Sequence, residues 1–401
     1  MVDVRVISNK ERVNSARVRP LSYKITPDCV GDTVTFSLSR PRNLSVEVNG
    51  DIFHNLHLFA NPIDKFRPSD KEIQRALKKK KGSNLIYFGP GVHNLPNDTL
   101  FVPSGTTVYI DGGARVYGNI FTEGAHDVNI FGRGEVHPDG RGAGVWVRRS
   151  KNVRIDGIVV SQLPIGQCDS VELTNVKSIS YYGWGDGMDV FSSSNVILDG
   201  VFCRNSDDCA AVYASTQGFK GGSNNVLVKN ATLWADVAHP INIGGHGDPN
   251  GMDTVQNVTF RNIDILDQAE KQVDYQGCLA INPGDNTLVR NITFENIRIE
   301  DFRNGQLVNF RISFNPKYCV STGRGIQNVL VKDVTYNGSG ENLSIIAGYD
   351  ENHKISGIRF VNLVVNGRKI TDDMPGKPKW YKTGDMAGIF VGEHVENLSF
   401  E

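Results

Sequence analysis

Acidic residues gather at two places in the middle of the chain, where their types and spacing suit acid–base chemistry. The two segments are Gly185-Asp186-Gly187-Met188-Asp189 and Asn205-Ser206-Asp207-Asp208-Cys209. Asp186 and Asp207 are 21 residues apart, close to one local repeat of the strand pattern described below, so we expect them on adjacent coils of a stacked fold. Adjacent parallel strands lie about 4.8 Å apart, which would bring the two carboxyl groups together. Repulsion between such close charges raises at least one pKa.

Asp207 and Asp208 are neighbours, so in a regular strand their side chains would point to opposite faces. Both reach one cleft only if a strand ends or bends between them. Three converging carboxyls suit hydrolysis of a glycosidic bond, in which one protonated carboxyl donates to the leaving oxygen and ionised partners activate water. A separation of about 6.5–9.5 Å would leave room for that water and give inversion, whereas about 5–5.5 Å would indicate retention. A surface aspartate ladder that binds water or a cation is the alternative interpretation.

Further polar and aromatic residues follow these segments. A histidine at His239 or His246 would be able to hydrogen-bond the acid or a sugar hydroxyl, although either one taken alone fits a structural role. Aromatic side chains can stack on the apolar surface of sugar rings, and packing within loops is the alternative for each of them. The aromatic residues of this region are Trp146, Tyr181, Tyr182, Trp184, Tyr213 and Trp234. The candidate substrate-binding residues are His239, His246, Trp184, Tyr213, Asn282 and Asp189.

The elements that must position these residues repeat along the chain. A small or polar residue, often Asn, precedes an alternating apolar strand at intervals of 20 to 37 residues, around Val128, Val153, Val176, Val196, Val226, Val258, Ile292, Val329 and Ile358. Repeats of this length indicate stacked units that are each too small to bury a core of their own. We therefore predict a parallel β-helix rather than a propeller, whose blades need more residues. Asn tolerates the left-handed backbone region, so most of these Asn residues are expected to be stacked turn residues.

The chain before the repeats has a different pattern. Residues 15–60 alternate as half-buried strands do, and Asn49-Gly50 suits a type I′ hairpin. A capping box at Ser69–Glu72 then begins an amphipathic helix that ends in the lysine run Lys78–Lys81, which we interpret as a solvated helix end. We predict an all-β chain with a small antiparallel module at 1–65 and a parallel β-helix at 66–401, whose open end the helix caps.

Composition excludes several classes of protein. The 401 residues include 43 Lys+Arg against 44 Asp+Glu, and 39% of them are hydrophobic, which excludes a disordered chain and a basic nucleic-acid binder. No apolar stretch approaches the ~18 residues that a membrane span needs. The six cysteines lack zinc-like spacing, so we expect no metal and no cofactor, although a single Cys203–Cys209 bridge is possible.

These motifs resemble a known family. The stretch from Ile73-Gln74-Arg75-Ala76-Leu77 to Gly91-Val92-His93 resembles the opening of pectinase-type β-helices. The two acidic segments and the later His-Gly segments resemble the polygalacturonase family (glycoside hydrolase family 28) and its relatives, the dextranase/isopullulanase family (glycoside hydrolase family 49). The resemblance covers residues 66–400 and implies a right-handed parallel β-helix and an inverting glycoside hydrolase. By motif position it implies Asp207 as the general acid, with Asp186 and Asp208 as the pair that activates water.

The sequence departs from the family pattern in three places. Trp184-Gly185-Asp186 replaces the family's Asn-Thr-Asp, and Ala238-His239-Pro240 occupies the place of its Gly-His-Gly. This order favours His239, with His246 as the second choice. The Arg-Ile-Lys segment that grips galacturonate is replaced around Gly277–Asn282, so we expect a neutral sugar at the cleavage subsite.

Two rival functions remain open. A polysaccharide lyase on the same architecture would need calcium and an Arg or Lys base, for which Arg204 is the nearby candidate. A noncatalytic glycan-binding β-helix would bind sugar without cleaving it. In each case the expected partner is a polysaccharide or oligosaccharide, not a nucleic acid or a membrane, and a polymeric substrate implies a secreted or periplasmic protein. Oligomeric state cannot be read from the sequence.

Overall fold

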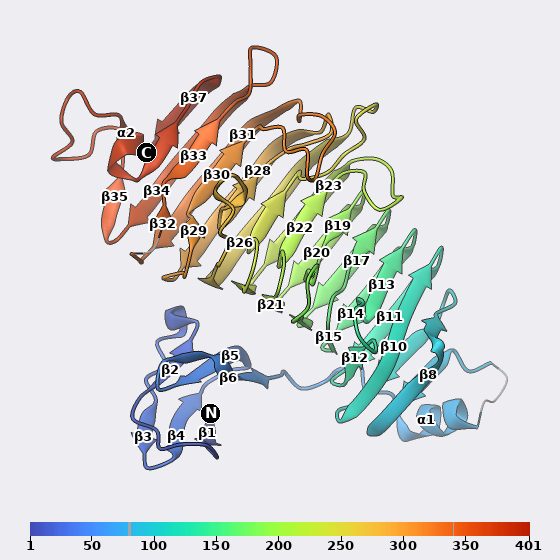
Figure 1. The fold of residues 1–401 in the computed structure, drawn as a ribbon. Helices are drawn as coiled ribbons and strands as arrows, with labels where there is room; N and C mark the ends of the chain where they lie inside the picture. Colours follow the sequence, from blue (N-terminus) through green and yellow to red (C-terminus); the bar gives the residue numbers. More distant parts are fainter. Residues whose placement is uncertain (79–81, 340) are drawn as a thin grey trace. The chain divides into compact units, whose positions relative to one another are not determined.

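A computed structural model describes residues 1–78, 82–339 and 341–401 (Figure 1). The chain divides into two compact units, Met1–Lys65 and Phe66–Glu401, which we describe separately. Lys79, Lys80 and Lys81 of the predicted basic run lie outside the described residues.

The first unit consists of two antiparallel three-stranded sheets, as predicted. One sheet has the order β1-β4-β3 and the other β2-β5-β6, and apolar side chains from both form a small core. Asn49 and Gly50 join β5 to β6 with positive φ values of 53° and 79°, the backbone that a tight hairpin needs. The elements are β1 (Val2–Ile7), β2 (Ala16–Arg19), η1 (Leu21–Tyr23), β3 (Asp28–Val30), β4 (Thr33–Leu38), β5 (Arg42–Val48) and β6 (Asp51–Ala60).

The second unit begins with the helix α1 (Asp70–Leu77). Its capping box is present in both directions, because the Ser69 hydroxyl accepts from the Glu72 backbone N–H and the Glu72 carboxylate accepts from the Ser69 backbone N–H. Ile73 is the buried residue of the helix, which contacts β7 (Leu85–Phe88) at the N-terminal end of the solenoid (Figure 1). The helix therefore lies where the apolar end of a solenoid requires a cap.

The rest of this unit is the predicted right-handed parallel β-helix, in which strands from successive coils pair to form three long faces (Figure 1). Face A contains β12 (Glu135–His137), β15 (Val159–Val160), β18 (Lys177–Ile179), β21 (Phe202–Asn205) and β24 (Thr232–Ala235). Face B contains β13 (Val145–Arg148), β16 (Ile165–Gly166), β19 (Val190–Phe191), β22 (Ala210–Tyr213), β25 (Ile241–Ile243), β27 (Leu279–Ile281), β30 (Val308–Arg311), β33 (Ser344–Ala347) and β36 (Ile389–Val391). Face C contains β11 (His126–Gly132), β14 (Lys151–Asp156), β17 (Asp169–Thr174), β20 (Ser194–Asp199), β23 (Ser223–Lys229), β28 (Leu288–Ile299), β31 (Gly325–Tyr336), β34 (Ile355–Val365) and β37 (Val395–Phe400).

The remaining elements join or close these faces. The strands β10 and β26 each pair with strands of two faces, and β29 pairs with β32 outside the main sheet. These elements are β7 (Leu85–Phe88), β8 (Gly91–Phe101), β9 (Thr107–Ile110), β10 (Ala114–Glu123), β26 (Thr254–Asp267), η2 (Val273–Tyr275), β29 (Gly305–Gln306), β32 (Glu341–Asn342), β35 (Arg368–Ile370) and α2 (Thr383–Met386). Among the described residues, we find no helix with the length and apolarity to cross a membrane.

On each face alternate side chains point inward, such as Val145 and Val147 of β13, and the inward side chains of successive coils stack into rows that form the core. Each Val or Ile buried in this way contributes about 1.5–3 kcal/mol. The pairing corrects one predicted repeat, because Val171 and not Val176 lies between Val153 and Val196 in the row. The two local repeats are therefore 18 and 25 residues long, and Val176 belongs to the turn that leads into β18. Cys203 and Cys209 are buried as free thiols, so the possible bridge between them is not formed.

The recurring Asn residues form a hydrogen-bonded ladder at the start of face C. Asn225 donates to Asn195, Asn257 to Asn224, Asn291 to Asn257 and Asn328 to Asn291, over 2.7, 2.8, 3.1 and 3.2 Å. The φ of Asn225, Asn257, Asn291 and Asn328 is 55–57°, in the left-handed region where most side chains are strained. The ladder thus joins neighbouring coils outside the core and fixes the turn of each coil.

We predict that replacing Asn257 by Ala destabilises the protein by about 1–3 kcal/mol, because left-handed strain is added and amide hydrogen bonds are lost. The Asn257→Gly variant should lose less, since Gly adopts this φ freely. Urea unfolding of the native protein and of both variants measures the free energy of unfolding of each and so ranks their stability. An Ala variant at least as stable as the Gly variant would contradict the assignment.

Candidate active site

Two bends on successive coils bring the three aspartates together. Asp186 lies in the loop from β18 to β19, and Asp207 and Asp208 lie in the bend from β21 to β22. Because β18 pairs with β21 and β19 with β22, the two bends lie one above the other. One carboxylate oxygen from each of Asp186, Asp207 and Asp208 lies within 4.8 Å of the others.

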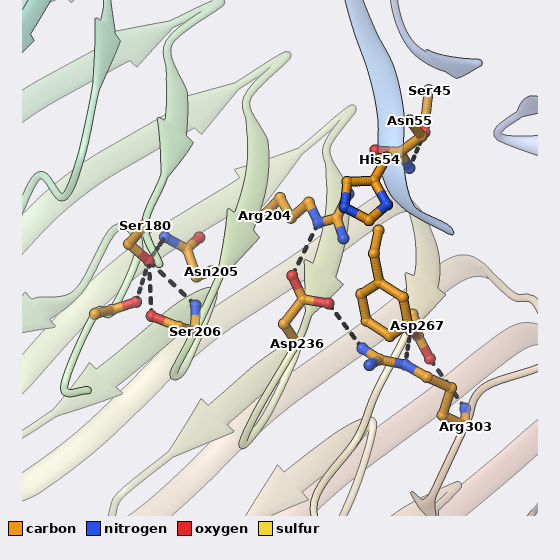
Figure 2. A network of polar contacts seen from close by, with 12 residues as sticks. Ser45, His54, Asn55, Ser180, Arg204, Asn205, Ser206, Asp236, Asp267 and Arg303 are labelled. Carbon is orange, nitrogen blue, oxygen red and sulfur yellow. Dashed lines mark hydrogen bonds and ion pairs between the residues drawn. The ribbon is translucent and has the colours of Figure 1, made fainter. Parts of the chain in front are cut away.

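A buried amide holds the two bends in place. The Asn205 side chain donates to the Ser178 and Ser180 hydroxyls and to the carbonyl of Asp186, over 3.0, 2.9 and 3.1 Å. The Ser180 hydroxyl also accepts from the backbone N–H of Ser206 at 3.1 Å and donates to the Gly185 carbonyl at 2.5 Å (Figure 2). The backbones that carry Asp186 and Asp207 are therefore joined through polar groups that water does not reach.

Gly187 lies directly against the second bend. A Cβ at this position would lie 2.2 Å from the carbonyl oxygen of Cys209 and 2.6 Å from the Asn205 side chain. Its backbone N–H donates to the carbonyl of Asp208 at 2.7 Å. The glycine of the Asp-Gly-Met-Asp segment is therefore needed for the close approach of the two coils.

Asp208 accepts hydrogen bonds on both carboxylate oxygens. The backbone N–H and the ring Nδ1 of His239 lie 3.0 and 2.7 Å from Oδ1. The Tyr213 hydroxyl and the Asn242 amide donate to Oδ2 over 2.6 and 2.8 Å. This network places the His239 proton on Nδ1. Four donors make Asp208 the carboxylate of this cluster whose ionised form has the most support.

The three carboxyls therefore differ in acidity. Burial, and next the charge of Asp208, raises the pKa of Asp186 to about 7. Burial, followed by the charges of Asp208 and Asp186, raises the pKa of Asp207 to about 8. Burial also opposes ionisation of Asp208, but His239, Tyr213 and Asn242 outweigh it and lower the pKa of Asp208. Near neutral pH this arrangement places one stable carboxylate beside a carboxyl that keeps its proton, which is the pairing required for general acid–base chemistry.

The short spacing of the carboxyls does not by itself identify a stereochemical course. The oxygens within 4.8 Å are closer than the 6.5–9.5 Å separation expected for inversion, and also closer than that expected for retention. Oxygens this close are also a ligand set for a hard cation such as Ca²⁺. A cation would have to displace the protons of Asp186 and Asp207, because only Asp208 favours ionisation in this environment.

The other predicted site residues fall into two groups. His239, Asp189 and Tyr213 are buried, with exposed fractions of 0%, 4% and 6%, so they lie behind the carboxyls rather than on an open surface. Burial, followed by the charges of the three site aspartates, holds the pKa of Asp189 well above its usual value.

The second group is more accessible. His246 packs edge-on against Tyr213 at 5.0 Å between ring centroids, and burial lowers the pKa of His246. Asn282 is half-buried and donates to Asn309 at 3.0 Å. Trp184 is 65% exposed, and its carbonyl accepts from Gln162 at 2.9 Å. Thus His239 contacts Asp208, while His246, Asn282 and Trp184 have surface that a ligand can reach.

Three residues of this region were not predicted from the sequence. Asn242 binds Asp208, and Tyr275 packs edge-on against His239 at 4.5 Å between ring centroids. Tyr275 stacks on Tyr318, and the Lys317 ammonium lies 4.8 Å above the Tyr318 ring. Asp207 is among the charges that raise the pKa of Lys317, after Tyr318 and Glu270. Tyr275 and Lys317 come from loop insertions whose path no repeat pattern predicts, whereas Asn242 was visible as the polar residue between two strand isoleucines.

Arg204, the candidate base of a lyase, already has partners. Its guanidinium stacks on the Trp234 ring at 4.2 Å and pairs with Asp236 at 2.9 Å. Asp236 also pairs with Arg303, which in turn binds Asp267 (Figure 2). Arg204 is therefore a member of a structural ion-pair network, and its guanidinium is engaged by Trp234 and Asp236 rather than directed at the three aspartates.

Comparison with known proteins finds relatives of this chain by sequence and by fold. Residues 144–374 match the family model described as glycosyl hydrolases family 28, a range that includes every candidate site residue. The polygalacturonase of Juniperus ashei is 26% identical over 295 residues, which is 65% of this chain and 54% of the relative. The chain spans about half the length of the curated relatives it matches first.

Two solved structures share the fold. Dex49A from Penicillium minioluteum has a TM-score of 0.63 at 14% identity, over 99% of this chain and 81% of that one. The family 28 exopolygalacturonase of Yersinia enterocolitica has a TM-score of 0.57 at 12% identity, over 99% and 96%. At these identities the likeness supports the β-helix fold and leaves the substrate undetermined.

The raised pKa of Asp207 predicts a pH-dependent stability difference. A carboxyl with a pKa near 3.9 when unfolded and about 8 when folded stabilises the protein below pH 4, and this contribution is lost as the pH rises towards 8. Asn cannot ionise, so Asp207→Asn should gain stability relative to the native protein between pH 5 and pH 9. Thermal unfolding at both pH values measures this difference, with exposed Asp98→Asn as the control. A difference that is constant or falls with pH would contradict the assignment.

Proposed function

The chain belongs to family 28 of the glycosyl hydrolases, and on this premise we propose that it hydrolyses glycosidic bonds in a polysaccharide or its oligosaccharides. The observation that carries the proposal is the unequal acidity of three adjacent carboxyls. The pKa of Asp207 is raised to about 8, so Asp207 keeps its proton at neutral pH. Hydrogen bonds lower the pKa of Asp208. Glycoside hydrolysis needs such a protonated acid beside an ionised base.

In this proposal Asp207 gives its proton to the glycosidic oxygen as the bond to the leaving sugar breaks. Asp208 accepts a proton from the attacking water, whose oxygen forms the new bond at the anomeric carbon. Asp186 lies within 4.8 Å of both and orients this water. His239, Tyr213 and Asn242 position Asp208 and keep it ionised, and exchange with solvent then restores the proton of Asp207.

We propose inversion as the course of the reaction. Asp186 and Asp208 lie together beside the acid, so Asp186 can orient one water molecule that gives its proton to Asp208. A covalent intermediate would instead require Asp208 to attack the anomeric carbon, but only 3% of this residue is exposed. A small water molecule therefore reaches this carboxylate more readily than the ring carbon of a sugar does.

A neutral sugar at the cleavage subsite fits the residues that replace the family's cation pair. The segment after Cys278 carries Ala280 and Asn282, and the Asn282 amide offers hydrogen-bonding groups suited to hydroxyls. Lys317, one of the cations of this region, is exposed and binds Gln272 at 3.1 Å, so it offers a single charge rather than a bidentate grip. A polymeric substrate further implies that the protein acts in a secreted or periplasmic setting.

Replacing Asp207 by Asn tests the function directly. We expect hydrolysis to fall by roughly 10²–10⁴-fold, because the acid is lost while the shape of the site is kept. Release of reducing ends from dextran, pullulan, rhamnogalacturonan and polygalacturonate measures it, with Asp98→Asn as the matched control. Near-native turnover by Asp207→Asn would rule out its role as the acid. Faster hydrolysis of polygalacturonate than of the neutral glucans would overturn the neutral-sugar preference.

Proton NMR of the first product tests the stereochemical course. Inversion predicts that the newly formed reducing end first appears with the anomeric configuration opposite to that of the cleaved bond, before mutarotation mixes the two. Initial appearance of the same configuration would indicate a covalent intermediate and would overturn the proposed role of the Asp186–Asp208 pair.

A further inference from the structure

The outer side of face B carries one continuous row of residues, one from each coil. The paired strands place them in the order Phe101, Phe121, Trp146, Pro164, Asp189, Ala211, Asn242, Ala280, Asn309, Ile345 and Phe390. The residues before and after each of them point into the core, as the buried Val145 and Val147 on either side of Trp146 do. We call this set the outer row.

The N-terminal end of the outer row is aromatic. Phe101 and Phe121 stack with 5.4 Å between ring centroids, and Phe121 and Trp146 with 6.4 Å. Phe101 is 60% exposed, and Phe121 and Trp146 are half-buried. Arg148 lies 4.5 Å from the Phe121 ring and 5.7 Å from the Trp146 ring, and pairs with Glu123 at 2.6 Å. These rings are thus held in fixed positions on the surface by a charged neighbour.

The aromatic residues nearer the site have a different environment. Phe191 and Tyr213, in the neighbouring outward row, pack with Phe219 and Ala211 into a buried cluster. Phe219 lies over Gly166, where a Cβ would meet its ring at 2.3 Å. Near the site the outer side of face B is therefore packed by its own residues, whereas at Phe101, Phe121 and Trp146 it has exposed aromatic surface.

The outer row connects this surface to the site. Trp146 is two coils from Asp189, or about 10 Å at the strand spacing of a parallel sheet. Asn242, which binds Asp208, lies two coils beyond Asp189 in the same row. The outer row therefore places the aromatic rings and the carboxyls along one line that runs from coil to coil.

We propose that Phe101, Phe121 and Trp146 form a binding track for sugar residues of the same polysaccharide chain that is cleaved at the carboxyls, several residues away from the cleaved bond. The inference rests on the proposed function and extends it to long chains as the substrate class. Aromatic rings bury the apolar side of sugars. The track offers one ring per coil, and a polysaccharide offers one sugar residue per repeat along its chain. Short oligosaccharides that fill only the cleavage site do not reach it.

A second protein is a poorer fit to this surface. A stable protein interface buries about 800 Å² on each partner. Three aromatic side chains supply at most about 150–250 Å² each, and here two of the three are half-buried. The Arg148 guanidinium lies against the Phe121 and Trp146 rings and pairs with Glu123, so the apolar surface is a narrow strip. A strip of this width suits an extended chain.

Binding without turnover gives the sharpest test. In the Asp207→Asn background, affinity electrophoresis and calorimetry with dextran and polygalacturonate should show that Trp146→Ala weakens polymer binding by about tenfold or more. Trp146→Phe should keep most of the affinity. Trp380→Ala is the matched control, because Trp380 is 83% exposed on a loop outside the outer row and its loss should leave binding unchanged. Thermal unfolding establishes that each variant is folded.

The outcomes separate this inference from the proposed function. Binding that depends on Trp146 in a protein that hydrolyses none of the polymers would support the track and refute the hydrolase. In an active enzyme, Trp146→Ala should raise KM for polymers and leave cleavage of short oligosaccharides unchanged. Equal binding by Trp146→Ala and its parent, no binding of either polymer, or a change in self-association alone would each overturn the track.

Discussion

The parallel pairing of strands between successive coils is the constraint on which the rest of the structure depends. It places Ile179 beside Arg204 and Val190 beside Val212, and the bends that lie between these strands are therefore held one above the other. Carboxyl groups that repel one another are therefore kept together by hydrogen bonds made elsewhere in the fold. The energy required to hold Asp186, Asp207 and Asp208 within 4.8 Å comes from the core rows and the Asn ladder, which lie away from the site.

The same constraint explains why the three carboxyls differ. Asp208 lies against the next coil, where the backbone and ring of His239 and the side chain of Asn242 are in reach. The backbone N–H of Asp208 donates to Asp207 at 3.0 Å, but burial and two neighbouring charges still raise the pKa of Asp207. A difference of one position along the chain thus separates a carboxylate from a carboxylic acid. Asp208 is ionised because its side chain faces the donors of the next coil, whereas Asp207 keeps its proton because its side chain does not.

Much of this could be predicted from the sequence where the signal is local. The Ser69–Glu72 capping box, the Asn49-Gly50 turn and the antiparallel module form as predicted, and so does the parallel β-helix. The three aspartates could be grouped because their spacing is close to one coil. The register around Val176 was wrong because Val171, preceded by Asp169 and Ser170 rather than Asn, lacks the usual turn signal. The burial of His239 and the positions of Tyr275 and Lys317 could not be predicted, since they depend on how loops of variable length pack.

The central claim is that Asp207 is protonated while its neighbour Asp208 is ionised. Carbon-13 NMR of protein labelled at the aspartate carboxyls measures this, with the Asp207→Asn and Asp208→Asn variants used to assign the two resonances. The account predicts that the Asp207 resonance titrates near pH 8, while the Asp208 resonance is that of a carboxylate throughout this titration. An Asp207 resonance that is already ionised at pH 6, or an Asp208 resonance that is protonated there, would contradict it.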